Sequence, residues 1–392
     1  MKTRVVVAMS GGVDSSVAAA LLEQQGYEVI GITMCFGLKE SDKKRPSCCG
    51  IEGIEDARRV AHKLGIKHYV LNFDKFLEEK VIQDFILEYL SGRTPNPCIR
   101  CNQYLKFGTL LAKAKSLGAE YLATGHYSRI EFDKNKKIFR LKKARDKFKD
   151  QSYFLYRITQ KQMARSLMPL GNLTKDKVRK LASDLGLSVA DKPASQEICF
   201  IPEADYRNFL KHELTRMSRQ NLFKLSRDPD IRKDDIGSGK NRIYTNINPG
   251  QILDTKGQVL GEHKGIPFYT IGQREGLGIA LGYPVYVTKI DARNNTIIAG
   301  KKEEALSYGL IAGDLSFTHK AIKRAVALSV KIRYNHQEVS SRIIPSGRNR
   351  VKAVFSKPQF AVTPGQSAVF YKQREVIGGG IIEKGLNNAE AR

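Results

Sequence analysis

The stretch RVVVAMSGGVDSSVAAALLEQQ, residues 4–25, decides the fold of this chain. Residues 4–9 form a short apolar run rich in valine, which predicts a buried strand of a parallel sheet. Residues 10–16 (SGGVDSS) form a glycine turn, and residues 13–25 follow with the spacing and composition of a helix. Glycines let the backbone approach an anion closely, and the amides at a helix N-terminus donate hydrogen bonds to it. The stretch therefore predicts a phosphate-binding turn between a strand and a helix.

The same alternation of strands and helices continues to residue 124. We expect further strands at residues 28–34, 67–72 and 120–124, and helices at residues 52–64, 76–90 and 105–117. Such alternation predicts an α/β fold with a doubly wound parallel sheet. Ligands of these sheets bind beyond the carboxyl ends of the strands, which is where the glycine turn is expected.

The remainder of the chain has a different pattern. From residue 249 onward, short alternating strands are separated by glycine and asparagine turns, which predicts a small β-barrel or sandwich. We therefore expect the sheet domain at residues 1–203, a small central domain at 204–284 and a C-terminal β-barrel at 285–392. Residues 216–247 are polar, basic and rich in turn-forming residues, which indicates a long insertion within the central domain.

Composition and charge narrow the classes of function. Of the 392 residues, 41% are hydrophobic, which excludes a globally disordered chain. The 66 Lys and Arg exceed the 40 Asp and Glu, so the formal net charge is +26. We interpret this excess as the mark of a polyanionic partner, most simply nucleic acid; an unusually basic surface or a host that grows at high temperature is the alternative. Because no apolar run is as long as a membrane span and no signal peptide precedes the first strand, we expect a cytoplasmic protein without a membrane partner.

Three of the six cysteines form a pattern of their own. Cys98 and Cys101 form a C-x-x-C pair in a proline-rich loop, residues 94–101, before a predicted helix, and Cys199 lies far along the chain. In a reducing compartment such thiols are catalytic, metal-binding or simply buried. A thiol near a helix N-terminus and basic residues is more easily ionised and is a better nucleophile. The adjacent pair Cys48–Cys49 is interpreted as loop residues, with a zinc site shared with the C-x-x-C pair as the alternative.

Six strings of residues resemble those of a known family. They are AMSGGVDSSVAA from Ala8, TPNPCIRCNQYLKFG from Thr94, ATGHY from Ala123, KDQSYFLY from Lys149, ADKPASQEICFI from Ala190 and FYTIGQREGLGI from Phe268. Together they resemble the tRNA-specific 2-thiouridylases, a branch of the PP-loop ATP pyrophosphatases, whose sheet domain has an adenine nucleotide alpha hydrolase-like fold. The glycine turn differs from the nucleoside-triphosphate loop because no lysine follows it, and from the dinucleotide fingerprint because G-x-G-x-x-G is absent.

The resemblance implies ATP-dependent 2-thiolation of the wobble uridine in the tRNAs for Lys, Glu and Gln. ATP would adenylate the C2 oxygen of the uracil and release pyrophosphate; sulfur would then attack C2, and AMP would leave. The implied ATP contacts are Ala8, Met9, Ser10, Gly11, Gly12, Val13, Asp14, Ser15, Met34 and Gly125. The carboxylate of Asp14 is also expected to hold a magnesium ion that bridges the phosphates. The implied partners are tRNA and a sulfur donor, which would be a persulfide relay protein, a cysteine desulfurase or sulfide.

The resemblance leaves two routes for the sulfur. In the family, the residue that matches Cys199 carries a persulfide, and the one that matches Cys101 is a second catalytic cysteine that can join it in a transient disulfide. Many members, however, have Asp where this chain has Cys98. With Cys in place of that Asp, the chain also has the three thiol ligands of a 4Fe–4S cluster with one open iron: Cys98, Cys101 and Cys199. The open iron would deliver a bound sulfide. In either route these three cysteines are the candidate catalytic residues. Both routes stay open at this point.

Further residues match family contacts with the tRNA. The implied contacts with the target base are Asn96, Pro97 and Cys98, and those with the rest of the tRNA are His126, Lys149, Asp150, Gln151, Arg333, Tyr334 and Gln366. Residues 134–149 and 320–352 each contain nine Lys or Arg against one acid, which favours phosphate contacts over a merely solvated surface. Two other functions compete with thiolation. Another PP-loop enzyme would adenylate a small metabolite and would need neither the cysteines nor the charge, and a non-catalytic protein would bind tRNA or carry an iron–sulfur cluster.

Overall fold

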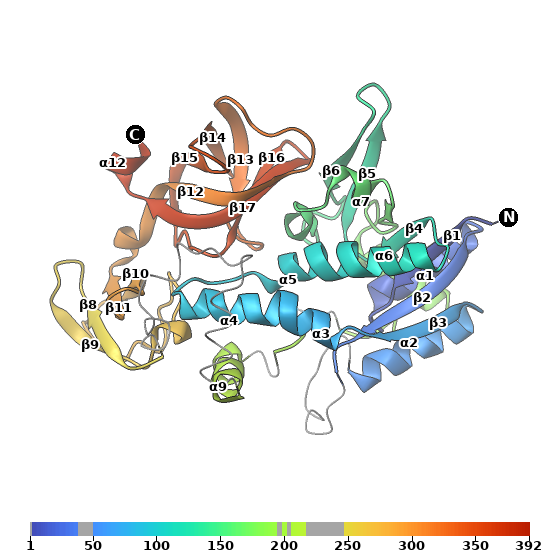
Figure 1. Cartoon of the computed structure of the whole chain (residues 1–392), viewed down its shortest axis with the longest axis horizontal. Helices are drawn as coiled ribbons and strands as arrows, with labels where there is room; N and C mark the ends of the chain where they lie inside the picture. Colours follow the sequence, from blue (N-terminus) through green and yellow to red (C-terminus); the bar gives the residue numbers. More distant parts are fainter. Residues whose placement is uncertain (1, 38–49, 194–197, 202–204, 217–246) are drawn as a thin grey trace.

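The N-terminal part of the chain is built on a five-stranded parallel sheet, which confirms the fold class predicted from the sequence (Figure 1). The computed structural model describes residues 2–37, 50–193, 198–201, 205–216 and 247–392. The strand order is β3-β2-β1-β4-β7, with β1 in the centre. The strands are β1 Arg4–Ala8, β2 Glu28–Cys35, β3 Lys67–Asn72, β4 Tyr121–Thr124 and β7 Ser166–Leu167.

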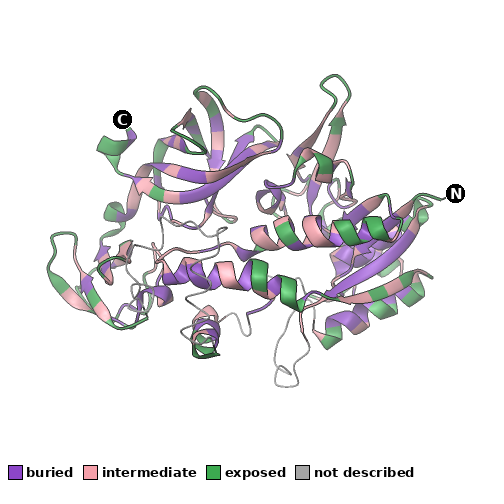
Figure 2. Ribbon diagram, viewed as in Figure 1, coloured by how far each residue is buried: buried purple, intermediate pink, exposed green. Residues whose placement is uncertain are grey.

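Helices cover both faces of this sheet. Successive side chains of β1 therefore point into two different cores. Val5 and Val7 pack with residues of α1, α2 and α8, whereas Val6 packs with residues of α4 and α6. Figure 2 shows the inward side of these helices buried and the outer side of α2 exposed. The helices are α1 Val13–Gln24, α2 Ile51–Lys63, α3 Asp74–Leu77, α4 Gln83–Leu90, α5 Pro97–Arg100, α6 Leu111–Ser116, α7 Gln160–Met163 and α8 Lys175–Asp184. None of the helices in the described ranges is long and apolar enough to cross a membrane.

The helix that carries Cys98 and Cys101 begins earlier than the sequence predicts. The predicted loop over residues 94–101 is wrong from Pro97 onward, because α5 starts there and continues into the π-helical segment Cys101–Leu110 and then α6. Asn96 caps this helix by accepting a hydrogen bond from the Ile99 amide at 3.4 Å. Proline is well suited to a first helical position, since it lacks the N–H that would be unsatisfied there. The two cysteines therefore lie in the first turns of one long helix.

A four-stranded sheet follows in the order β10-β11-β8-β9. Its strands are β8 Gly250–Leu253, β9 Val259–His263, β10 Tyr286–Asp291 and β11 Thr296–Gly300. The division expected at residue 285 falls inside this sheet, because β11 pairs with β8 in parallel. Helix α9 Tyr206–Arg216 instead packs on the N-terminal domain, where Phe209 lies 6.0 Å from Phe85 between ring centroids. The insertion expected at residues 216–247 lies almost entirely outside the described residues, as do Cys48 and Cys49.

The C-terminal part forms the expected β-barrel. Six antiparallel strands close on themselves because β12 pairs with both β15 and β17. They are β12 Leu306–Phe317, β13 Val326–Lys331, β14 Val339–Pro345, β15 Val351–Phe360, β16 Ser367–Lys372 and β17 Glu375–Leu386, and a short helix α12 Asn388–Ala391 follows. A hairpin of the N-terminal domain, β5 Ser128–Asp133 and β6 Ile138–Lys143, joins the barrel at the start of β17, where Lys142 pairs with Glu375. The barrel is thus attached to the domain that carries the glycine turn.

Candidate active site

The glycine turn lies between the carboxyl end of β1 and the start of α1, as predicted. Gly11 has a φ of +72°, and a Cβ there would lie 2.1 Å from the carbonyl oxygen of Gly53 in α2, so no other residue fits. The Ser15 hydroxyl donates to the carbonyl of Gly12 at 3.1 Å and accepts from the Ser10 amide at 3.2 Å. Gly12 is the N-cap of α1 and has no side chain with which to cap the first amides. The turn is therefore fixed in shape, and its N-terminal amides have no competing cap from that residue.

Two further predicted ATP contacts lie next to this turn. Gly125 follows β4, and a Cβ on it would lie 2.7 Å from the amide nitrogen of Ser15. Met34 is buried near the end of β2, and the neighbouring Thr33 donates its hydroxyl to the carbonyl of Met9 at 2.8 Å. Residues from β1, β2 and β4 thus meet at one edge of the sheet. This arrangement is the one expected for a ligand at the carboxyl ends of parallel strands.

The carboxylate of Asp14 is held by two residues that sequence reasoning did not identify. The Tyr127 hydroxyl and the Lys175 ammonium both approach its Oδ1 atom, at 2.7 and 2.6 Å. The Lys175 side chain is only 10% exposed, so its charge is directed into the site. Burial and the neighbouring Asp14 raise the pKa of Tyr127, which keeps its hydroxyl protonated as a donor. Tyr127 ends the ATGHY string, which the sequence singles out. No sequence signal indicates that Lys175, at the start of α8, points toward the glycine turn.

The three cysteines differ in exposure. Cys98 is exposed, whereas Cys101 and Cys199 are partly buried and pack against the same hydrophobic core of the N-terminal domain. Among the residues that the structure describes, no three His, Cys, Asp or Glu side chains are grouped so that they could hold a metal ion. Because all three cysteines are described, the predicted set of three cluster ligands is not assembled in this structure.

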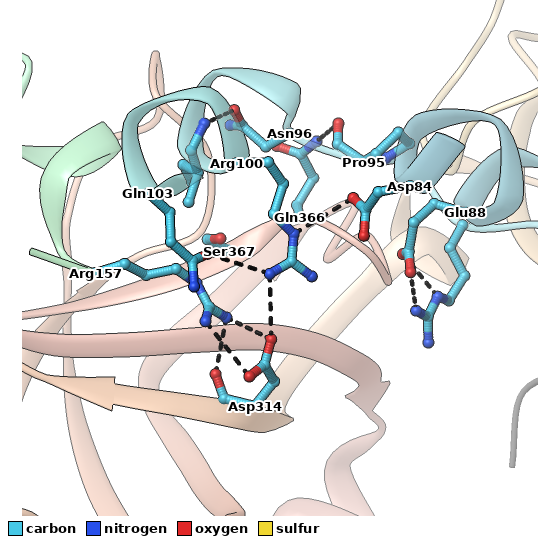
Figure 3. Close-up of polar contacts among 12 residues, drawn as sticks. Asp84, Glu88, Pro95, Asn96, Arg100, Gln103, Arg157, Asp314, Gln366 and Ser367 are labelled. Atoms are coloured by element: carbon cyan, nitrogen blue, oxygen red, sulfur yellow. Dashed lines mark hydrogen bonds and ion pairs between the residues drawn. The ribbon is translucent and has the colours of Figure 1, made fainter. Parts of the chain in front are cut away.

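The barrel contacts the loop that carries Pro95 and Asn96, directly before the cysteine helix (Figure 3). The Gln366 amide donates to the carbonyl oxygens of Thr94 and Pro95, at 3.1 and 3.0 Å. Gly365 has a φ of +91°, and a Cβ there would lie 2.8 Å from the Thr94 backbone, so the two segments are in close contact. The barrel therefore fixes the residues that directly precede the cysteine helix.

An ion-pair cluster makes a second connection between the helix and the barrel (Figure 3). Arg100, at the end of α5, lies 3.4 Å from Asp84 in α4 and 3.6 Å from Asp314 in β12. Asp314 also pairs with Arg157 at 2.6 Å and has a φ of +48°, an uncommon conformation for a residue with a side chain. Burial alone would lower the pKa of Arg100, but Asp84 and Asp314 outweigh it and raise that pKa. A cavity of about 560 Å³ adjoins this cluster and is lined from both domains, by Asn96, Arg348 and other residues.

Comparison with known proteins establishes the family. Residues 3–203 match the tRNA methyl transferase HUP domain family, residues 241–301 its PRC-barrel domain and residues 307–382 the aminomethyltransferase beta-barrel domain. The chain is 48% identical to the "tRNA-specific 2-thiouridylase MnmA" of Pelotomaculum thermopropionicum over 97% of this chain and 98% of that protein. It belongs to the tRNA-specific 2-thiouridylase family. The protein of the same description from Halothermothrix orenii is also 48% identical, over 97% of this chain and 99% of its own length.

The family residues expected to contact tRNA on the barrel side make internal contacts in this structure. The Arg333 guanidinium donates to the carbonyl oxygens of Ile271 and Ala361, at 3.1 and 2.9 Å, and burial lowers its pKa. Tyr334 packs on Phe154 with ring centroids 4.5 Å apart. Together with Gln366, these side chains join the barrel to the segment between β9 and β10, to the N-terminal domain and to the loop before the cysteine helix. In the described structure, Arg333, Tyr334 and Gln366 therefore connect domains.

The expected contacts near the glycine turn are also largely structural. Asp150 is buried and accepts hydrogen bonds from the Ala144 and Ser152 amides, and Gln151 accepts one from the amide of Tyr127. His126 is buried, with Nδ1 2.8 Å from the Thr124 hydroxyl. Burial, reinforced by the nearby charge of Lys106, lowers the pKa of His126 well below its usual value, so the ring is neutral at physiological pH. Lys149 is partly buried beside these residues.

The basic stretch 134–149 divides into paired and exposed charges. Lys142 forms an ion pair with Glu131, and Lys143 forms one with Glu338 of the barrel. The exposed members are Lys134, Lys136 and Lys137 at the hairpin tip and Arg145 and Lys147 beyond β6. The exposed set is therefore the part of this stretch that is best placed to meet phosphates.

Proposed function

We propose that this protein is an ATP-dependent 2-thiolase of the wobble uridine in the tRNAs for Lys, Glu and Gln. The observation that carries the proposal is the SGGVDS turn, held against Gly125 and Asp14–Lys175, in a chain that is 48% identical over nearly its whole length to proteins named as tRNA-specific 2-thiouridylases. The net charge of +26 supports a nucleic-acid substrate rather than a small metabolite.

In the proposed first step, ATP lies along the edge of the sheet and the uracil C2 oxygen attacks its α-phosphorus. Pyrophosphate leaves with the electrons of the broken P–O bond, and the C2 oxygen becomes part of a good leaving group. The proposed ATP contacts are residues 8–15, Met34 and Gly125, joined by Lys175. Lys175 would supply the positive charge that the glycine turn lacks. A magnesium ion bound with ATP would neutralise phosphate charge, and Asp14 would meet it through the carboxylate oxygen that Tyr127 and Lys175 do not occupy.

In the proposed second step, sulfur replaces the adenylated oxygen. A persulfide on Cys199 attacks C2 through its terminal sulfur and AMP leaves, which joins the base to Cys199 through a disulfide. The Cys101 thiolate then attacks the Cys199 sulfur, forms a Cys101–Cys199 disulfide and releases the 2-thiouridine. With a persulfide-bearing protein as donor, an external thiol first reduces the Cys101–Cys199 disulfide, and the donor then transfers its outer sulfur to Cys199. With sulfide as donor, the sulfide attacks the Cys199 sulfur of the disulfide, which forms the persulfide directly and releases the Cys101 thiolate. The partial burial of both cysteines against one core supports this route.

The alternative route through a 4Fe–4S cluster requires Cys98, Cys101 and Cys199 to converge on one cluster. Those three side chains do not form a ligand group in the described structure, and the persulfide route needs only two of them to meet. We therefore argue the persulfide route and leave the cluster as an outcome of the test. In that route Cys98 stands at the exposed start of the helix, beside Asn96 and Pro97, where it would border the flipped uracil. The proposed tRNA contacts remain His126, Lys149, Asp150, Gln151, Arg333, Tyr334 and Gln366, which would act mainly by shaping the surface.

The experiment that tests the sulfur chemistry compares single cysteine substitutions. Cys101→Ser and Cys199→Ser are expected to abolish thiolation of unmodified tRNA, while Cys98→Asp retains activity. Cys35→Ser, in β2, is the matched control and is expected to have little effect. Iron is measured in anaerobically purified protein. About four irons per chain, lost together with activity in Cys98→Asp, would reject the persulfide route and support the cluster. Failure of every variant and of the wild type to thiolate tRNA with ATP and a sulfur source would reject the proposed function.

A further inference from the structure

Phe148 is exposed to an unusual degree for an aromatic residue. Its side chain is 95% exposed, compared with 64% for Ile51, the next most exposed large hydrophobic residue in the described part of the chain. Single exposed hydrophobic side chains are common on protein surfaces, so exposure alone does not indicate a function. The surroundings of Phe148 do indicate a function, because the turn that carries it is basic and is held in place by hydrogen bonds.

Hydrogen bonds fix the backbone on both sides of Phe148. One oxygen of Asp146 accepts from the amides of Phe148 and Lys149, at 2.9 and 3.2 Å. The other oxygen of Asp146 accepts from the Lys175 amide at 2.9 Å. Lys175 is the residue whose ammonium group pairs with Asp14 in the glycine turn. The ring is therefore presented to solvent from a turn that is bonded directly to the proposed ATP site.

The charge around the ring selects the kind of partner. Phe148 lies between Lys147, which is exposed, and Lys149, which is partly buried, and Arg145 is exposed two residues before Lys147. An aromatic ring flanked by cations suits a ligand that combines a flat apolar face with nearby negative charge. An unpaired RNA base and its phosphates have this combination, and stacking of bases on aromatic side chains is a general mode of single-strand recognition.

We propose that Phe148 is a stacking platform for an unpaired base of the bound tRNA, next to the target uridine. This inference rests on the proposed function and deepens it, because it adds a contact to the loop that must present the uracil to the ATP site. Since the backbone of the turn is already ordered by Asp146, stacking on Phe148 costs little additional backbone entropy. Stacking needs only a π face, so the contact would hold the loop without reading its sequence.

The chain contains no tryptophan, so Phe148→Trp introduces a single tryptophan at the proposed contact, and its fluorescence can be excited separately from that of the 16 tyrosines. We expect saturating unmodified tRNA to quench this fluorescence and Phe148→Trp to keep wild-type affinity within about threefold. Phe148→Ala should weaken tRNA binding by roughly 5- to 100-fold, the range expected for loss of one base stack. The slope of log affinity against log salt should stay unchanged in Phe148→Ala, since no phosphate contact is lost, but fall by roughly 0.7 to 0.9 in Lys147→Gln.

Phe132→Ala is the matched control, because Phe132 is also exposed on the neighbouring hairpin, at 51%, but packs on Phe139. It should leave tRNA affinity unchanged. The inference would be overturned if tRNA did not quench the fluorescence of Phe148→Trp and Phe148→Ala bound tRNA with normal affinity. Thiolation at the wild-type rate in Phe148→Ala would then leave the proposed function intact. If Phe148→Ala bound tRNA normally but lost activity only with a protein sulfur donor, and not with sulfide, the ring would belong to a protein contact and the inference would also be rejected. Wild-type protein that does not bind tRNA at all would instead reject the proposed function.

Discussion

The glycine turn and the cysteine helix both belong to the N-terminal domain, but different parts of the molecule hold them. The turn is shaped by glycines, by hydrogen bonds between Ser10 and Ser15, and by Lys175 of the same domain. The cysteine helix packs in the same domain, but the barrel also holds it, through Asp314 on Arg100 and through Gln366 on the loop that precedes the helix. ATP activation and sulfur delivery are therefore expected to respond separately to substitution. We expect the barrel to position the helix that carries Cys101.

The largest expected effect lies on the glycine-turn side. Asp14→Asn and Lys175→Met should each lower the thiolation rate by about 100-fold or more, because each removes a charge that orders the phosphates in the transition state. Binding of tRNA should stay within a few-fold of wild type, since neither side chain faces the exposed basic surface. Thiolation and tRNA affinity are measured side by side, with the exposed neighbour Asp176→Asn as the control. Near wild-type activity in both variants would show that this site does not bind ATP.

A smaller effect is expected on the barrel side. Asp314→Asn should lower kcat by roughly tenfold with an unchanged KM for ATP, because Arg100 and Arg157 lose their shared carboxylate and the start of the helix shifts. Asparagine tolerates a positive φ, so the substitution isolates the charge. The free energy of unfolding should fall by about 2 kcal/mol, as for loss of a charged hydrogen bond. Glu303→Gln, at an exposed position near β12, is the control. A changed KM for ATP without a change in kcat would remove the distinction between the two regions.

The smallest expected effect is a difference in acid sensitivity. His126 on the glycine-turn side is neutral in the folded protein, whereas the unfolded chain binds a proton there below about pH 6.5. The unfolded state therefore binds more protons, and the free energy of unfolding should fall as the pH decreases from 7 to 5. His126→Gln should reduce this pH dependence, and His212→Gln, at an exposed position, should not. Identical pH profiles for wild type and His126→Gln would contradict a buried, neutral ring.

The two regions also differ in how far the sequence predicts them. The strand, turn and helix at residues 4–25 are specified by local pattern, so their place at the carboxyl edge of the sheet could be predicted directly. The start of the cysteine helix at Pro97 was missed, although Asn96 and Pro97 are a favourable cap and first residue. Lys175 and Asp314 could not be predicted from pattern, because their side chains meet the site only through tertiary packing. Tertiary packing also makes Arg333 and Tyr334 part of the contacts between domains. A sequence match cannot distinguish such a contact from a contact with RNA.

The central claim is that ATP activates the C2 oxygen of the uridine itself. It is tested most directly with tRNA in which that oxygen is labelled with ¹⁸O, incubated with the wild-type protein, ATP and a sulfur source. The account predicts one AMP for each 2-thiouridine formed, with the ¹⁸O in the phosphate of AMP and none in pyrophosphate. Thiolation accompanied by ADP, or by AMP that contains no ¹⁸O, would contradict it.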